Sequence, residues 1–420
     1  MTLQQDTIQW IHTFKANGRK TDLKRMAWLL EQVGNPQDKF PAIHVVGTNG
    51  KGSVTAYLQH IFSQSGYKVG TFTSPFILSF HDRICINGQA ISDQDLLAIA
   101  ERLKPLLERL SQETSWDRPT EFELVTLIMF YYFAFYNPVD LAIIEAGIGG
   151  KGDATNVFQA LALICPSISF DHQERLGYSL KAIAKQKAGA IKTQQKVIIG
   201  KLDKEAQDVF LKTSLDTQSS LFQLGKDFHL IDYQEYFDFT YQDITLKELK
   251  LLLIGHHQRE NACLAIMTAL QLRETFPNLS LASIQEGVQS TTWPGRSELI
   301  KPNILLDGAH NPDAILKLRQ LLMDHFSDRS IRILFAGLKR KPLRELLQLL
   351  SDYPITVTSF DFFEACPLED YSQAYAKTED YRKWLLKTTT SSDLIVVTGS
   401  LYFISEVRRF CLDMLNTKKP

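Results

Sequence analysis

The chain has 420 residues, of which 44% are apolar and 22% are charged, and its 46 Lys and Arg side chains nearly balance 47 Asp and Glu side chains. At about 100 to 200 residues per domain, this length predicts two or three domains rather than one compact core. The net charge of -1 excludes an overall field that would attract nucleic acid or an anionic membrane. We therefore expect neither as a partner, and any bound anion must be captured by a local site.

The most apolar segment and the N-terminus both argue against a membrane or secreted protein. The run Leu124–Tyr136 contains Thr126 and is shorter than the about 18 to 20 residues that a bilayer requires. The start, MTLQQDTIQW, lacks a basic stretch followed by an apolar one, which a secretory signal would have. We expect a cytoplasmic protein. Its five cysteines, which form no CxxC pair, are predicted to be reduced and mostly buried: Cys85, Cys165, Cys263, Cys366 and Cys411.

Short apolar strands alternate with helical patterns in the first two thirds of the chain, which predicts a mostly parallel α/β sheet. The segment Glu121–Tyr136 is apolar all round and suits a buried helix, whereas Gln223–Leu253 alternates like a small antiparallel layer. The predicted buried strands are Ala42–Val46, Leu141–Ile144, Leu161–Ile164 and Val197–Ile199, and Pro166–Phe170 is also strand-like.

A domain boundary is predicted near residue 295. The segment Thr291–Arg296 breaks a helical pattern that ends at Val288, and strands and helices alternate again beyond it. The predicted pairs are Ile304–Leu306 with Pro312–His325, Ile331–Phe335 with Leu343–Leu350, and Leu394–Val397 with Phe403–Leu415. Residues 296–420 therefore form a second, smaller α/β unit of ordinary domain size.

The strongest local signal is HVVGTNGKGS, residues 44 to 53, which lies between a predicted strand and a predicted helix. Small residues there let backbone N–H groups close round a phosphate, and Lys51 can reach the terminal phosphates. The loop departs from the common P-loop pattern, because Val45 stands where the first glycine is expected and Gly52 displaces the hydroxyl residue. The alternative is a glycine-rich turn with an exposed lysine, but the strand before it and the helix after it favour phosphate binding.

Glu145 follows the predicted strand Leu141–Ile144 and precedes a cluster of glycines at residues 147, 149 and 150. A nucleoside triphosphatase commonly holds magnesium through an acidic residue at such a strand end. The alternative is a surface carboxylate that caps the strand. The adjacent glycines, which permit close approach of the backbone, favour the functional interpretation.

His172 and Lys187 are weaker candidates. His172 follows the strand-like segment Pro166–Phe170, and taken alone it is more often a hydrogen-bonding loop residue than a ligand. Lys187 lies next to small residues in KQKAGA, and it is either solvated and inert or converted to a carbamate that offers oxygen to magnesium. Spacing alone favours the inert lysine.

Eight motifs in one order now reveal a resemblance. They are GTNGKGS, TSP (Thr73–Pro75), EAGIGGKGDATN (Glu145–Asn156), DHQERLGYSLKAIAKQKAGAIK (Asp171–Lys192), GHHQRENA (Gly255–Ala262), WPGRSE (Trp293–Glu298), DGAHNP (Asp307–Pro312) and GSLYFISEVR (Gly399–Arg408). Together they closely resemble folylpolyglutamate synthase, of the Mur ligase superfamily, over residues 44 to 408. The resemblance implies an N-terminal P-loop ATPase-type domain with a mostly parallel sheet, residues 1–295, and a smaller C-terminal Rossmann-like α/β domain, residues 296–420.

The resemblance also implies a reaction and its participants. ATP phosphorylates the terminal carboxylate of a reduced folate, the amino group of L-glutamate attacks the acyl phosphate, and ADP and phosphate leave. A monomer is expected, with ATP and two magnesium ions at the site. An enzyme that also joins glutamate to dihydropteroate is a close alternative, a ligase of cell-wall precursors fits less well, and a nucleotide-dependent switch is the alternative from another class.

Individual roles follow from the same resemblance. Catalysis is implied for Lys51, His172 and Lys187; the last matches a lysine that the family carries N-carboxylated, which reverses the interpretation from spacing. Magnesium binding is implied for Ser74, Glu145, His172 and Lys187. Nucleotide binding is implied for Gly47, Thr48, Asn49, Gly50, Lys51, Gly52, Ser53, Asn261, Arg296, Asp307 and His310, and Ser400 matches a serine near the catalytic cleft. The chain departs from the family pattern at Phe76 and at His81–Arg83, in the loop that contacts the pterin side of the folate.

Overall fold

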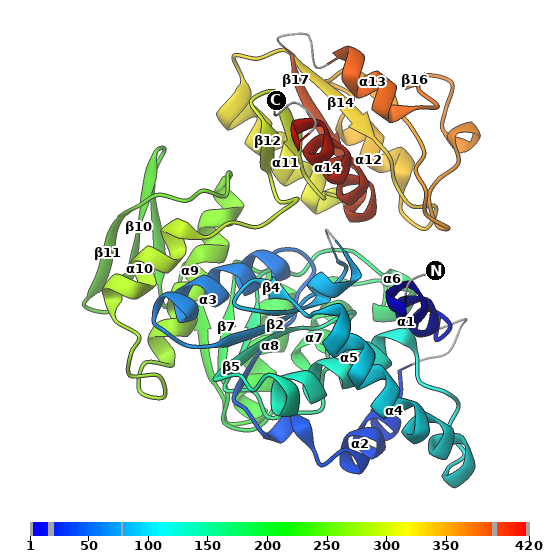
Figure 1. The fold of residues 1–420 in the computed structure, drawn as a ribbon. Coiled ribbons are helices and arrows are strands. Elements are labelled where there is room, and N and C mark those ends of the chain that lie inside the picture. Colours follow the sequence, from blue (N-terminus) through cyan, green and yellow to red (C-terminus); the bar gives the residue numbers. More distant parts are fainter. Residues whose placement is uncertain (1–2, 16–20, 77–78, 389–392, 417–420) are drawn as a thin grey trace. The chain divides into compact units, whose positions relative to one another are not determined.

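The computed structural model describes residues 3–15, 21–76, 79–388 and 393–416, and the chain divides into two compact units. The first unit comprises Met1–Ser74, Phe80–Lys250 and Glu260–Thr291, and the second comprises Pro75–Ser79, Leu251–Arg259 and Thr292–Pro420. Each unit is built around its own sheet (Figure 1). The α/β class predicted for both parts of the chain is confirmed. A boundary at residue 295 stays a prediction, while the observed division follows Thr291.

An eight-stranded sheet forms the centre of the first unit, in the order β4-β3-β2-β5-β1-β6-β7-β8. The six strands from β2 to β8 in that order pair in parallel, and β3 and β4 extend the sheet antiparallel. The central strands are apolar throughout because helices cover both faces of such a sheet. The strands are β1 Ala42–Val45, β2 Val69–Phe72, β3 Ile84–Ile86, β4 Gln89–Ala90, β5 Leu141–Glu145, β6 Ala162–Cys165, β7 Lys196–Ile199 and β8 Ser220–Gln223.

The helices of this part of the chain include the predicted buried one. It is α5, Glu121–Tyr131, which continues as a π-helical turn over Tyr132–Tyr136. The other helices are α1 Leu3–His12, α2 Leu23–Gln32, α3 Lys51–Gln64, α4 Asp93–Glu113, α6 Gln173–Leu176, α7 Leu180–Ala188, α8 Lys204–Asp216, α9 His256–Gln271 and α10 Leu281–Ser290, with 3₁₀ turns at Pro36–Asp38 and Phe80–Arg83.

A buried ion pair anchors the start of α5. Glu123 is fully buried, its carboxylate accepts from the Thr120 N–H at 2.7 Å, and Arg25 of α2 donates to both its oxygens at 2.7 and 2.8 Å. Thr120 also accepts from the Glu123 N–H, which completes a capping box. The pair thus ties α2 to the first turn of α5.

Three antiparallel strands confirm the small layer predicted over Gln223–Leu253. They are β9 His229–Tyr233, β10 Tyr236–Tyr241 and β11 Ile244–Leu249. Phe237, Phe239 and Leu249 are fully buried, whereas their neighbours in sequence are more exposed, as expected for a sheet with one solvated face.

The second unit has a six-stranded sheet in the order β12-β13-β17-β14-β15-β16, in which β12 alone pairs antiparallel. Buried apolar clusters lie on its two faces, one containing Leu318 of α11 and the other Ile404 of α14. The elements are β12 Glu298–Lys301, β13 Ile304–Leu306, α11 Pro312–Phe326, β14 Ile331–Phe335, α12 Leu343–Leu349, β15 Ile355–Val357, a 3₁₀ turn Leu368–Asp370, β16 Ala376–Lys377, α13 Tyr381–Thr388, β17 Leu394–Thr398 and α14 Leu401–Asn416.

Two further predictions concern the cysteines and a membrane-spanning helix. All five cysteines are free, and all but the half-buried Cys85 are buried. Within the part of the chain that the structure describes, no helix is long and apolar enough to cross a bilayer.

Candidate functional site

The glycine-rich loop after β1 has the backbone geometry of an anion site. Gly47 and Gly50 adopt φ values of 136° and 87°, and α3 begins at Lys51. A Cβ atom at Gly50 would lie 2.6 Å from the Asn261 side-chain oxygen, so glycine is required there and Asn261 lies against the loop. No side chain caps α3, and the N–H groups of its first turn therefore remain available to an anion.

The segment after β6 holds this loop in place, and the prediction of a strand over Pro166–Phe170 is wrong. The backbone groups of this segment form hydrogen bonds with the glycine-rich loop instead of with a neighbouring strand. The Ser167 carbonyl accepts from the Thr48 N–H at 2.9 Å, and the Ser167 hydroxyl accepts from the Asn49 N–H at 2.9 Å. Thr48 Oγ1 donates to the Ser169 carbonyl at 3.1 Å. The loop is thus pre-organised, and the backbone N–H groups of Thr48 and Asn49 are already used.

Lys51 and Glu145 form an ion pair beside the loop. Lys51 Nζ lies 3.6 Å from Glu145 Oε1 and donates to the Thr48 carbonyl at 3.1 Å. Glu145 ends β5, which is paired with β1, and its side chain is only 5% exposed. The Ser74 N–H donates to Glu145 Oε2 at 3.4 Å, which places the TSP motif next to the same carboxylate.

Lys187 is buried behind the glycine-rich loop, at the last turn of α7. It is 4% exposed, and its Nζ donates to the Gly47 carbonyl at 2.7 Å. Burial, with the positive charge of Lys51 as the next cause, lowers the pKa of Lys187 to about 7, although the negative charges of Asp171 and Asp153 oppose the shift. A substantial neutral fraction of this amine is therefore present at neutral pH.

His172 lies at the start of α6, next to Asp171. Its backbone is left-handed, with φ 49°, and it precedes α6. The His172 ring nitrogens lie 3.9 Å from Asp171 Oδ1 and 3.8 Å from Glu174 Oε1. Asp171 also acts on the Lys187 ammonium, so the histidine and the lysine share one acidic neighbour.

The donor set suits magnesium held jointly with phosphates. Within the described residues, no cluster of three or more His, Cys, Asp or Glu side chains could hold a metal ion alone. Magnesium needs only one or two protein oxygens when substrate phosphates and water complete its shell. Glu145 and the Ser74 hydroxyl fit that requirement, since they come from adjacent strand ends.

Three predicted nucleotide-binding residues of the second unit, Arg296, Asp307 and His310, lie in the segments before β12 and after β13. Asp307 accepts from the Ser297 N–H at 3.0 Å and from the Ala309 N–H at 2.9 Å. Burial raises the pKa of Asp307, while the positive charge of Arg296 opposes that change. His310 Nδ1 donates to the Gly308 carbonyl at 2.7 Å, which leaves Nε2 as an acceptor when the ring is neutral. Nearby in the same unit, Ser400 is 2% exposed at the start of α14.

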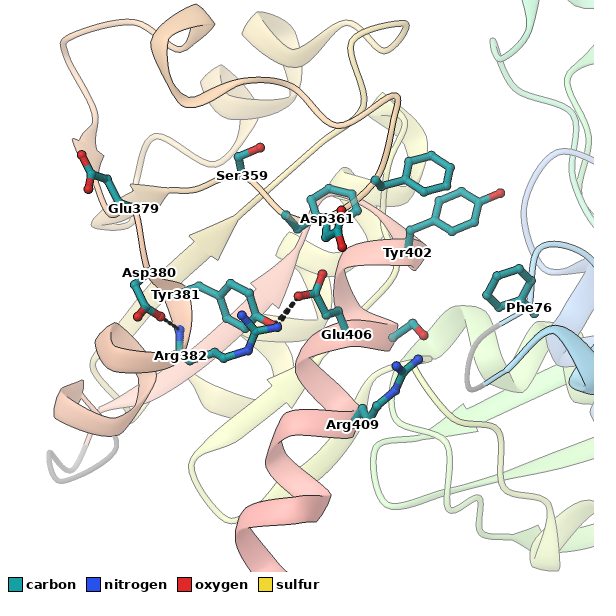
Figure 2. A pocket seen from close by; sticks show the side chains of 13 residues that line it. Phe76, Ser359, Asp361, Glu379, Asp380, Tyr381, Arg382, Tyr402, Glu406 and Arg409 are labelled. Carbon is teal, nitrogen blue, oxygen red and sulfur yellow. Dashed lines mark hydrogen bonds and ion pairs between the residues drawn. The ribbon is translucent and has the colours of Figure 1, made fainter. Parts of the chain in front are cut away.

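The second unit also contains a pocket of about 780 Å³ (Figure 2). The rings of Phe362 and Tyr402 stack in its wall, 4.1 Å apart at 17°. Arg382 donates to Glu406 at 2.5 Å, and the Tyr381 hydroxyl donates to the same carboxylate at 2.8 Å. The lining comprises Phe76, Ser359, Phe360, Asp361, Phe362, Glu379, Asp380, Tyr381, Arg382, Tyr402, Ser405, Glu406 and Arg409.

Comparison with known proteins shows the family. Residues 45–269 match the Mur ligase middle domain. The chain is 36% identical to dihydrofolate synthase/folylpolyglutamate synthase of Bacillus subtilis, with 97% of this chain and 99% of the relative covered, and 34% identical to folylpolyglutamate synthase of Lacticaseibacillus casei, with 97% and 98% covered. The chain belongs to the folylpolyglutamate synthase/dihydrofolate synthase family of Mur ligases. A solved folylpolyglutamate synthase–AMPPCP–folate complex matches with a TM-score of 0.86 at 32% identity and covers 97% of this chain and 99% of its own.

Members of this family are ligases that add glutamate to folates, and the motifs that indicated the family gather in two groups. In the first unit, Ser74, Glu145, Lys187 and Asn261 surround the glycine-rich loop. In the second unit, the predicted nucleotide contacts surround Asp307. The individual roles of these residues stay predictions.

The sequence did not predict the residues that hold the loops of the site in place, and it did not predict the pocket of the second unit. Ser167 and Ser169 lie in Pro166–Phe170, whose composition predicts a strand. Asp153 and Thr155 stand inside the motif EAGIGGKGDATN but received no role, although both are buried. For the pocket, the available signal was the aromatic content of FDFF, residues 360 to 363, and of GSLYF, residues 399 to 403.

Proposed function

We propose that this protein is an ATP-dependent ligase that adds L-glutamate to the terminal carboxylate of tetrahydrofolate and extends the product to polyglutamates. One observation carries the proposal: the glycine-rich loop, the Lys51–Glu145 pair and the buried Lys187 amine lie together in the first unit. The names of the two relatives and the AMPPCP–folate complex of a solved homologue support it.

The reaction requires two anions to meet. A folate carboxylate oxygen attacks the γ-phosphorus of ATP, ADP leaves, and an acyl phosphate remains. The glutamate amine then attacks the acyl carbon, the bond from that carbon to the phosphate oxygen breaks, and phosphate and the amine proton leave. The N-terminus of α3 and Lys51 supply positive potential to the triphosphate. Magnesium, held through Ser74 and Glu145, would neutralise phosphate oxygens.

We also propose that Lys187 is carboxylated. Its neutral amine would add to carbon dioxide, forming an N–C bond and releasing one proton. The lowered pKa of about 7 makes that amine available near neutral pH. The resulting carbamate would offer oxygen to magnesium together with His172, in place of a positive charge. Asn261, Arg296, Asp307 and His310 remain the proposed nucleotide contacts outside the glycine-rich loop.

We infer that the pocket of the second unit receives the flat ring system of the folate. The stacked Phe362 and Tyr402 offer an aromatic face, and Phe76 lies edge-on to Tyr402, 6.0 Å away at 83°. The carboxylate of Asp361 lines the same pocket and can accept N–H groups from a heteroaromatic ring.

The decisive experiment measures ADP release by purified protein with ATP, magnesium, tetrahydrofolate and L-glutamate. We expect release only when both folate and glutamate are present, because the acyl phosphate forms on one and is consumed by the other. ADP release without glutamate would instead support a nucleotide-dependent switch, and no release at all would refute the ligase. Replacing tetrahydrofolate with dihydropteroate decides whether the protein is also a dihydrofolate synthase, as the name of the Bacillus subtilis relative says of that protein.

A further inference from the structure

A buried trio of side chains, His44, Thr155 and Asp153, lies beneath the loop that follows Glu145. His44 on β1 places Nε2 2.9 Å from Thr155 Oγ1, and Thr155 Oγ1 donates to Asp153 Oδ1 at 2.7 Å. The three residues are 2%, 0% and 4% exposed. A buried polar group costs free energy unless it is hydrogen-bonded, and rotation of any one of these side chains would break a hydrogen bond of the trio. The three side chains are therefore held in a single arrangement.

The direction of each hydrogen bond is fixed. Thr155 has one hydroxyl proton and gives it to Asp153, so its oxygen accepts from His44, which must carry its proton on Nε2. Burial lowers the pKa of His44 to about 3, with the charge of Lys192 as a smaller cause, and the ring is therefore neutral. A neutral donor suits this position inside the sheet.

Asp153 organises the turn directly after Glu145. Its Oδ2 accepts from the Ile148 N–H at 2.8 Å, and its Oδ1 accepts from the Thr155 N–H at 3.0 Å. The Asp153 N–H closes the turn by donating to the Gly150 carbonyl at 3.1 Å.

The other side of the same loop docks on the end of α7. The Lys151 N–H donates to the Gln186 carbonyl at 2.6 Å, and a Cβ atom at Gly150 would lie 2.7 Å from the Lys187 carbonyl oxygen. The loop therefore connects the strand end that carries Glu145 with the helix end that carries Lys187.

We propose that Thr155 is a positioning residue for ligation, acting through Asp153 and His44 to hold the loop that sets the spacing of Glu145 and Lys187. This inference rests on the proposed function. The glycine-rich loop is held by hydrogen bonds to Ser167, in which no side chain of the trio takes part. Loss of the Thr155 hydroxyl should therefore impair catalysis while leaving nucleotide binding intact.

The test compares Thr155→Val, which removes the hydroxyl at similar volume, with Thr155→Ser, which keeps it. Because a misplacement of about 1 Å can cost about 100-fold, we expect Thr155→Val to lower kcat about 10- to 100-fold with the KM for ATP unchanged within about twofold. Thr155→Ser should keep kcat within about threefold of wild type. Thr268→Val is the matched control, since Thr268 is equally buried and donates within α9 at 2.7 Å.

A second measurement does not require activity. Hydrogen–deuterium exchange should accelerate over residues 147–156 in Thr155→Val and stay unchanged there in Thr268→Val. Wild-type kcat in Thr155→Val, an equal loss of kcat in Thr268→Val, or unchanged exchange over residues 147–156 would each overturn the proposal. If the wild-type protein shows no glutamate-dependent ADP release, the proposed function fails, and positioning for ligation fails with it even where the exchange result shows that the trio orders the loop.

Discussion

His44 makes the stability of the first unit depend on pH in a way that the structure quantifies. Its side chain is enclosed in β1 and bonded to Thr155, and burial lowers its pKa from 6.5 to about 3. The folded protein therefore keeps His44 neutral at pH values where the unfolded chain takes up a proton. The contribution of neutral His44 to the unfolding free energy is fully present above pH 6.5 and is lost as the pH falls from 6.5 toward 3.

The size of the effect follows from proton linkage. Below an unfolded pKa of 6.5, each pH unit removes about 1.4 kcal/mol from the unfolding free energy. Between pH 8 and pH 5 the contribution of His44 alone is about 2 kcal/mol. His44→Gln removes this dependence, because an amide can donate to Thr155 but does not titrate.

The assay is urea unfolding at pH 8 and pH 5, followed by tryptophan fluorescence. Replacing Trp293 and Trp384 with Phe confines the signal to the first unit, which contains the other three tryptophans. The quantity of interest is the difference in unfolding free energy between the protein that retains His44 and the His44→Gln variant. This difference should fall by about 2 kcal/mol from pH 8 to pH 5, since the contributions of all other titrating groups are the same in both proteins and cancel. Parallel pH profiles of the two proteins would refute the argument, as would an NMR titration of the folded His44 ring near pH 6.5.

Three further changes probe the ligase site and the fold. Lys187→Ala should abolish ligation, while calorimetry should still detect binding of AMPPCP. Added short-chain carboxylates should restore part of the activity if Lys187 carries a carbamate. Wild-type turnover in this variant would exclude a role of Lys187 in ligation. Tyr402→Leu should raise the KM for tetrahydrofolate about two- to tenfold by removing a stacking face, with the KM for ATP unchanged. An unaltered KM for tetrahydrofolate would show that the pocket is not part of the folate site. Glu123→Gln should lower the urea-unfolding free energy of the first unit by about 3 to 5 kcal/mol, because it leaves the buried Arg25 charge unpaired; a loss below about 1 kcal/mol, the range of exposed pairs, would contradict that reasoning.

The class of fold and the identity of the family could both be predicted from local patterns in the sequence. Apolar runs such as Leu141–Ile144 and the all-apolar Glu121–Tyr136 specify buried strands and a buried helix, since periodicity and length are local properties. Glycines at 47 and 50 and Lys51 predict a phosphate-binding loop for the same reason, because backbone conformation and reach depend on adjacent residues.

Contacts between groups that are distant in the sequence could not be predicted and depend on the folded chain. Pro166–Phe170 has the composition of a strand, yet its hydrogen bonds go to the glycine-rich loop, and no local pattern encodes that partner. Lys187 was ambiguous in sequence because its pKa depends on burial and on Lys51, which lies 136 positions earlier. The trio that joins His44 to Asp153 likewise spans more than a hundred residues. Desolvation and hydrogen-bond pairing are properties of the folded neighbourhood, which is why these features emerged only with the structure.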